Sequence, residues 1–193
     1  HTYALPAGYD EARHHQLALW TDFLGYFGLE RAPERSVCPP PKPDEPPVIG
    51  LICGSENTPA KRWPVRHWRA LLAAVPEARF VLFGTPGDRV LTTAVAAGAD
   101  TARVENLAGQ TDLPAFIARL RACHALVAND TGGLHLANAL GVPVIGLFGP
   151  TNPVRTGPVF SAPTVVLQPP GCPPTGGGSL EALAPETVAT ALR

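Results

Sequence analysis

The segment that decides the fold reads ALVANDTGGLHLANALGVPVIGLF and covers residues 125–148. Residues 125–128 and 144–148 are short apolar runs that predict buried strands, and residues 133–140 between them predict a short helix ending at Gly141. A strand, a helix and a second strand in this order form one βαβ unit, in which the two strands are parallel. The segment therefore predicts an α/β protein.

The same alternation extends from residue 48 to the end of the chain. Further strands are predicted at 48–53, 80–83, 104–107 and 164–167. Further helices are predicted after Pro64 and at 88–97, 112–120 and 186–192. The apolar faces expected to be buried are Trp68, Leu71, Leu72 and Val75 in the helix after Pro64, and Leu113, Phe116, Ile117 and Leu120 in the helix at 112–120. With right-handed crossovers these units give a doubly wound, Rossmann-like parallel sheet.

Two different segments precede this domain. Residues 10–28 carry Leu17, Trp20, Leu24 and Phe27 at helical spacing and predict a helix. Residues 31–47 are rich in proline, which suits neither a helix nor a central strand. We therefore expect a helical segment at 1–30, a linker at 31–47 and a ligand-binding domain at 48–193.

Composition limits the classes of function. The 193 residues are 45% hydrophobic and 16% charged, which suffices for a globular core, and the formal net charge is −1. No basic surface is expected for nucleic acid, and no run of eighteen apolar residues predicts a membrane span. The sequence begins at His1 and contains no Met, so we interpret it as part of a longer protein.

The cysteine pattern fits a reducing, cytoplasmic setting. No C-x-x-C pair occurs among the four cysteines. Cys53 and Cys123 lie in apolar segments and are predicted to be buried free thiols. Cys38 and Cys172 lie in proline-rich loops, and a disulfide between them is left open.

In the usual strand order of such a sheet, the first and fourth strands are neighbours at the switch point, where ligands bind. Each of these two strands is followed by an unusual loop. The loop at 54–64 offers the Lys61 ammonium to a phosphate and the Ser55 hydroxyl as a donor, although Lys61 also fits a solvated basic turn. The loop at 129–135 brings Gly132 and Gly133 to a helix N-terminus, whose amides and dipole favour a diphosphate.

Alternatives remain for the residues around these glycines. Asp130 or Thr131 can instead cap the helix, and Asp130 can orient the loop, because a carboxylate repels a diphosphate. His135 fits a structural role and a ligand-binding role equally well. The loop at 149–158 either borders the ligand or is a turn made rigid by proline. G-x-G-x-x-G after the first strand, a P-loop, a G-x-S-x-G elbow and metal-ligand spacing of His residues are all absent.

Three blocks of sequence together resemble glycosyltransferase family 9, the ADP-heptose:lipopolysaccharide heptosyltransferases, especially the second type. They are PAKRWP at 59–64, NDTGGLHLA at 129–137 and ALGVP at 139–143 running on to LFGPT at 147–151. The resemblance implies a GT-B fold of two domains, of which this chain is the C-terminal, donor-binding half. It implies inverting transfer with no cofactor and no metal, and a catalytic base in an N-terminal domain that this sequence lacks.

By this resemblance, Lys61 contacts the diphosphate or sugar of the donor. Asp130, Thr131, Gly132, Gly133 and His135 are expected to line the donor site, with Asp88 near the ribose and Thr111 near the base.

The expected function is transfer of a heptose or related sugar from a nucleoside diphosphate sugar, ADP-heptose first, to an acceptor of the lipopolysaccharide core. The expected setting is the cytoplasm, with peripheral association at the inner face of the inner membrane. We expect the 193 residues alone to bind donor weakly and to turn over nothing. The alternatives are a nucleotide-sugar epimerase of related fold and a non-catalytic nucleotide-sugar-binding domain.

Overall fold

The protein forms a six-stranded parallel sheet in the order β3-β2-β1-β4-β5-β6. The structure is a computed structural model that describes residues 5, 7–10, 12–29, 34–40, 46–55 and 58–193. The strands are β1 Val48–Ile52, β2 Arg79–Phe83, β3 Val104–Asn106, β4 Ala125–Asn129, β5 Val144–Leu147 and β6 Thr164–Leu167. The predicted doubly wound α/β fold is confirmed, including the pairing of β1 with β4.

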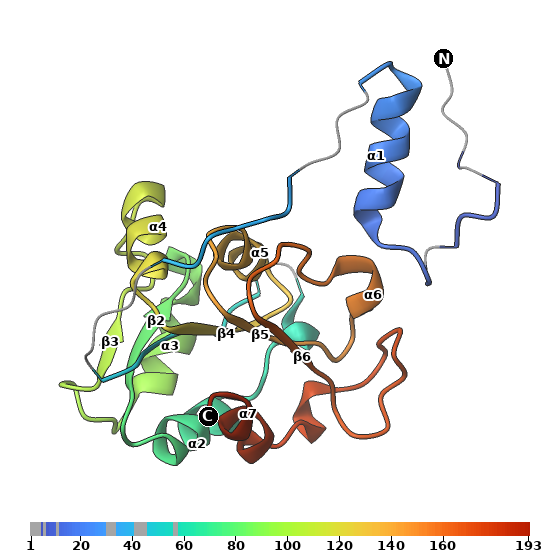
Figure 1. The fold of residues 1–193 in the computed structure, drawn as a ribbon. Coiled ribbons are helices and arrows are strands. Elements are labelled where there is room, and N and C mark those ends of the chain that lie inside the picture. The colour runs from blue at the N-terminus through green and yellow to red at the C-terminus, as the bar shows by residue number, and fades with distance from the viewer. Residues whose placement is uncertain (1–4, 6, 11, 30–33, 41–45, 56–57) are drawn as a thin grey trace.

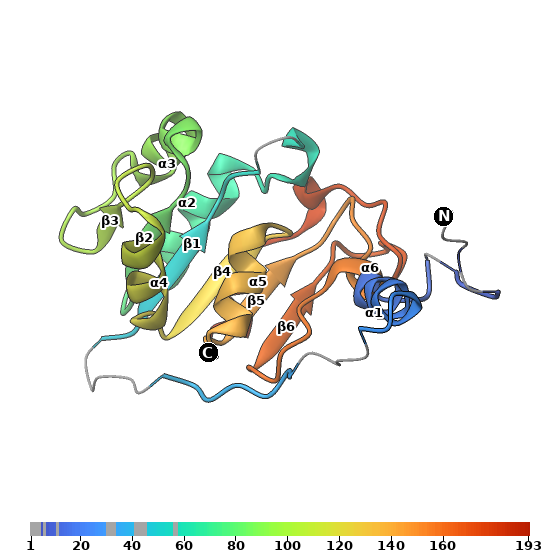
Figure 2. The ribbon, with the colours of Figure 1, turned by 90° about the horizontal axis from the view of Figure 1, so that it is seen from above.

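Helices cover both faces of this sheet. The helices of the described residues are α1 Gln16–Tyr26, α2 Val65–Ala74, α3 Arg89–Ala96, α4 Leu113–Arg121, α5 Gly132–Ala139, α6 Pro153–Thr156 and α7 Pro185–Ala191. Figures 1 and 2 show α4 and α5 over one face and α2, α3 and α7 over the other. The core is accordingly divided into two apolar clusters, one on each side of the sheet.

The predicted apolar face is buried in α2 and only partly buried in α4. The predicted face of α2 is buried, with Trp68 and Leu71 fully inside. In α4, Leu120 is buried, but Leu113 is 62% exposed, although the sequence placed it on the same face. Leu113 is the first residue of the helix and lies beyond the end of the sheet, so it has no strand to pack on.

The helix α1 differs from its prediction in two ways. It begins at Gln16, six residues later than expected, because the His15 side chain caps it by accepting the Leu17 amide. Its apolar residues are not buried in the described structure, since Trp20 is 50% exposed and Phe27 is 57% exposed. Much of the predicted linker at 31–47 lies outside the described residues.

The glycine-rich stretch at 176–178 is hydrogen-bonded to the loop that follows β5. The amides of Gly177 and Gly178 donate to the Gly149 carbonyl at the end of β5, at 2.9 and 3.0 Å. Gly176 has φ +83°, and a Cβ there would lie 2.3 Å from the Thr151 carbonyl oxygen. The stretch is glycine because the backbone must fold back at this point.

The four cysteines are free, so the disulfide that the sequence left open is not formed. Cys53 and Cys123 are fully buried, as predicted. Burial, and next the charge of Asp88, raise the pKa of Cys53 well above its ordinary value. This thiol is therefore protonated and unreactive. No helix in the described part of the chain is long and apolar enough to cross a membrane.

Candidate functional site: two strand-end loops at the switch point

The two loops predicted to face each other meet through an ion pair. Lys61 Nζ lies 3.0 Å from Asp130 Oδ2. The contact forms because β1 and β4 are parallel neighbours, so the loops that follow them leave the sheet at the same edge. Lys61 is 25% exposed in its side chain and Asp130 only 7%. The prediction that these loops face each other is confirmed.

Asn129 ties the same two loops together and was missed as a site residue. Its side chain is fully buried at the end of β4. Its Nδ2 donates to the Cys53 carbonyl at 2.8 Å, and its Oδ1 accepts the Trp63 amide at 3.3 Å. An asparagine ending an otherwise apolar strand was the available signal, since a buried amide needs partners on both of its atoms.

Asp130 is the centre of a small polar cluster. Its carboxylate also receives the Thr156 hydroxyl at 3.4 Å, and His135 Nε2 lies 3.6 Å from Oδ1. Burial raises the pKa of Asp130, but the contacts from His135, Lys61 and Thr151 and the charge of Lys61 outweigh it and hold that pKa below its ordinary value. Asp130 therefore orients both loops, the role that sequence reasoning left open.

This lowered pKa predicts a loss of stability in acid. The ionised Asp130 stabilises the folded state fully above the unfolded-state pKa of about 3.9, and this contribution is lost as pH falls from there through the folded-state value. Urea unfolding should give Asp130→Asn a lower free energy of unfolding than the wild type at neutral pH, and this difference should become smaller only in the acid range. A difference in the free energy of unfolding that stays constant at acid pH would contradict a stabilising role for the ionised Asp130.

The start of α5 has open space on one side and close packing on the other. A Cβ on Gly132 would meet nothing within 4 Å, whereas one on Gly133 would lie 2.3 Å from Ile52 Cδ1. Gly132 thus leaves the backbone accessible, and Gly133 lets the helix approach β1. The Thr131 hydroxyl is buried and has no partner among the described residues. The Leu134 amide donates to the Thr131 carbonyl at 3.1 Å, which leaves the amides of Gly132 and Gly133 as the first-turn groups without a helical partner. These donors are available to an anion.

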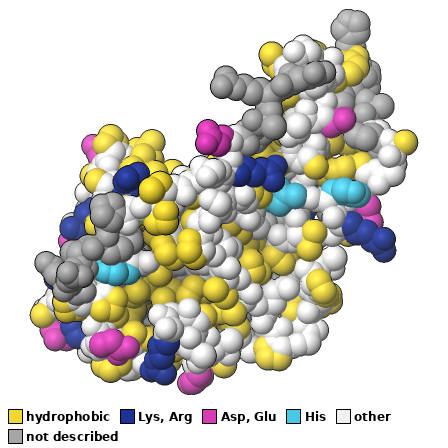
Figure 3. Space-filling view, viewed as in Figure 1, with side chains coloured by type: hydrophobic (Ala, Val, Ile, Leu, Met, Phe, Trp, Pro, Cys, Tyr) yellow, Lys and Arg dark blue, Asp and Glu magenta, His cyan; other side chains and the backbone are white. Residues whose placement is uncertain are grey.

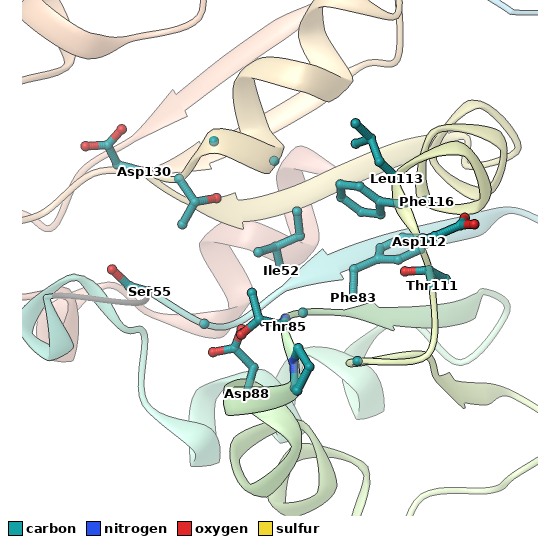
Figure 4. Close-up of a pocket in the computed structure, with 17 residues that line it drawn as sticks. Ile52, Ser55, Phe83, Thr85, Asp88, Thr111, Asp112, Leu113, Phe116 and Asp130 are labelled. Carbon is teal, nitrogen blue, oxygen red and sulfur yellow. Dashed lines mark hydrogen bonds between the residues drawn. The ribbon is translucent and has the colours of Figure 1, made fainter.

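A cavity of about 540 Å³ opens beside these donors at the carboxyl ends of β1, β2 and β4. One end is apolar, and Figure 4 shows Ile52, Phe83, Leu113 and Phe116 converging there. The other end is polar, and the Asp130 carboxylate in Figure 4 points away from the cavity. Sequence reasoning missed the four apolar residues, since each also fits an ordinary core position.

The cavity brings together most of the predicted site residues. Its lining includes Ser55, Asp88, Thr111, Asp130, Thr131, Gly132 and Gly133. Lys61 and His135 lie on the far side of the Asp130–Gly132 turn, where they line a second cavity. The predicted residues are therefore one cluster distributed around this turn.

Asp88 also has a structural role in this cluster. Its Oδ2 accepts the Thr85 amide and the Thr85 hydroxyl, both at 2.9 Å, which orders the loop after β2. Its Oδ1 lies against Gly54, where a Cβ would be only 2.1 Å away. Gly54 is thus required by the approach of a buried carboxylate. In the described residues no group of three or more His, Cys, Asp or Glu side chains could hold a metal ion.

A six-stranded parallel sheet with a cavity at the carboxyl ends of its central strands defines a Rossmann-like α/β domain, the class in which ligands bind at the switch point. The particular family follows from comparison with known proteins. The family model for glycosyltransferase family 9 (heptosyltransferase) matches residues 23–177. The chain belongs to this family, and the resemblance inferred from its sequence blocks is confirmed.

Individual relatives agree with this assignment. Lipopolysaccharide heptosyltransferase 2 of Escherichia coli is 37% identical over 127 residues, which are 63% of this chain and 36% of that protein. The solved structure of E. coli ADP-heptose lps heptosyltransferase II aligns with TM-score 0.69 and 34% identity, covering 78% of this chain and 46% of that one. E. coli heptosyltransferase WaaC with ADP aligns with TM-score 0.64 and 27% identity, over 78% and 45%. The chain thus spans little more than a third of the curated relative's length.

Proposed function

We propose that this chain is the donor-binding part of an inverting heptosyltransferase that uses ADP-heptose. One observation carries the proposal: the Lys61 ammonium and the open amides at the start of α5 lie side by side across the switch point, joined through Asp130. A cation and unpaired N–H donors at one place favour a dianionic diphosphate. The family membership makes that diphosphate part of a nucleotide sugar.

The cavity supports a place for the rest of the nucleotide. Its apolar end, where the rings of Phe83 and Phe116 pack edge-on with centroids 5.2 Å apart, would take the nucleobase. Asp88 lies on the polar side, where a ribose hydroxyl could reach its carboxylate, and Thr111 lies on the rim near the proposed base. The related structures with ADP and with ADP-2-deoxy-2-fluoro heptose support adenine as that base.

In the proposed reaction an acceptor hydroxyl oxygen bonds to the anomeric carbon while the bond from that carbon to the diphosphate oxygen breaks. The hydroxyl proton passes to a general base, and the leaving nucleoside diphosphate keeps the electron pair. Lys61 and the α5 amides stabilise the charge that grows on the leaving group. By family resemblance the base and the lipopolysaccharide-type acceptor site belong to an N-terminal domain. The proposed setting is the cytoplasmic side of the inner membrane, and four free cysteines fit such a compartment.

Calorimetric titration of the 193-residue chain tests the proposal. We expect ADP and ADP-heptose to bind, UDP- and GDP-sugars to bind more weakly, and no sugar transfer to occur. If the titration with ADP gave no heat of binding, the proposed donor site would be wrong. Sustained transfer by these residues alone would place the base within them. The family match does not support the epimerase alternative or the non-catalytic alternative. Release of free sugar without an acceptor would indicate the epimerase.

A further inference from the structure

A second cavity of about 530 Å³ lies on the other side of the Asp130–Gly132 turn. It shares Lys61, Asp130, Thr131 and Gly132 with the site described above, three of which also line the first cavity. Its opposite wall comes from α1, which precedes the sheet domain in sequence. Figure 3 shows basic and histidine side chains in the notch where the α1 segment meets the body of the molecule.

The helix α1 is held at this place by specific contacts. His15 Nδ1 accepts the Leu17 amide at 3.1 Å, so the neutral ring carries its proton on Nε2, which then donates to the Gly157 carbonyl at 3.0 Å. Asn152 Nδ2 donates to the Ala12 carbonyl at 2.9 Å. Both contacts join the α1 segment to the chain around α6, as the two helices lie together in Figures 1 and 2.

The relative placement of the two cavities determines what the second one can hold. If a nucleoside occupies the first cavity and its diphosphate lies at the turn, the group on the distal phosphate emerges on the far side. In a nucleotide sugar that group is a ring with hydroxyls at its edge and C–H bonds on its faces. The second cavity offers the polar groups of Arg155, Thr156 and His135 and the flat indole of Trp20.

We infer that the second cavity holds the sugar ring of the donor and that the indole of Trp20 packs against a face of that ring. The inference rests on the proposed function, because it needs the diphosphate at the Asp130–Gly132 turn. An aromatic side chain with an apolar face and little conformational freedom suits a ring whose polar atoms are at its edge. Trp20 then contributes to the binding of the nucleotide sugar but not to the binding of the nucleotide alone. The helix α1 is therefore part of the site, although it lies outside the sheet domain.

Fluorescence quenching by acrylamide tests this directly. The chain has three tryptophans, and Trp63 and Trp68 are 1% and 0% exposed, so the quencher reaches Trp20. Saturating ADP-heptose should lower the quenching constant by about twofold, because a ring laid on the indole covers one of its two faces. Saturating ADP should leave the constant unchanged.

Calorimetry on two variants supplies the second readout. Trp20→Ala should weaken ADP-heptose binding by about fivefold and leave ADP binding unchanged, as expected for one aromatic contact. Phe27→Ala removes an exposed aromatic ring from the end of the same helix, away from the cavity, and should change neither affinity. Near-ultraviolet circular dichroism checks that Trp63 and Trp68 keep their packing.

The outcomes separate the inference from the proposed function. If ADP and ADP-heptose both bind, but ADP-heptose gives no protection of Trp20 and Trp20→Ala changes the two affinities equally, the sugar does not lie on Trp20 and the inference is wrong. If ADP itself does not bind, the proposed donor site is wrong and the inference is lost with it.

Discussion

Replacing Lys61 with alanine is expected to weaken ADP binding by about 100-fold, the largest effect of any single change in the site. Two causes act together. The diphosphate loses the cation proposed to hold it, and the Asp130 carboxylate, 7% exposed and 3.0 Å from that cation, loses its charge partner. An unpaired carboxylate at the turn repels the negatively charged diphosphate of ADP. Isothermal titration of ADP measures the change.

Two further variants separate these causes. Arg69→Ala removes an exposed positive charge from α2 and should leave ADP affinity unchanged. The double variant Lys61→Ala with Asp130→Asn removes both charges and should recover about tenfold of the loss, because the repulsive part disappears. If Lys61→Ala bound ADP with wild-type affinity, the proposed contact between Lys61 and the diphosphate would be ruled out. A double variant no better than the single one would show that repulsion contributes nothing.

Replacing Asn129 with aspartate is expected to destabilise the fold by about 3 kcal/mol, although the two side chains have the same shape. The Nδ2 donor, 2.8 Å from the Cys53 carbonyl and 3.4 Å from the Gly54 carbonyl, becomes an oxygen that repels both. The site is fully buried, so water cannot relieve the conflict. Thermal unfolding should show the melting temperature lowered by about 6–12 °C.

The matched control for this change is Asn106→Asp in β3. The Asn106 side chain is only partly buried, and its Oδ1 accepts the Ala108 amide at 3.2 Å, a bond that aspartate keeps. Its effect should stay within about 0.5 kcal/mol. If Asn129→Asp were equally mild, the amide would not be what joins the loops after β1 and β4.

Much of the candidate site followed from patterns along the chain. Apolar runs ending in glycine predicted strands whose carboxyl ends meet at one edge, and the pair of glycines before α5 predicted a helix N-terminus open to an anion. The apolar end of the cavity was not predictable in this way. Leu113 and Phe116 have the spacing of a buried helical face, and only the position of the first turn of α4, at the end of the sheet, leaves them lining a cavity.

The sequence by itself determined the strands and helices of the domain, the parallel sheet, the family and the loops that carry the site, because periodicity and turn residues act over a few neighbouring positions. Tertiary structure decided which groups within those loops meet. Lys61 pairs with a carboxylate 69 residues away, and Gly157 accepts from a histidine 142 residues away. Such pairs depend on which strands are neighbours and on where each chain leaves the sheet, and no local pattern encodes the direction of a single side chain.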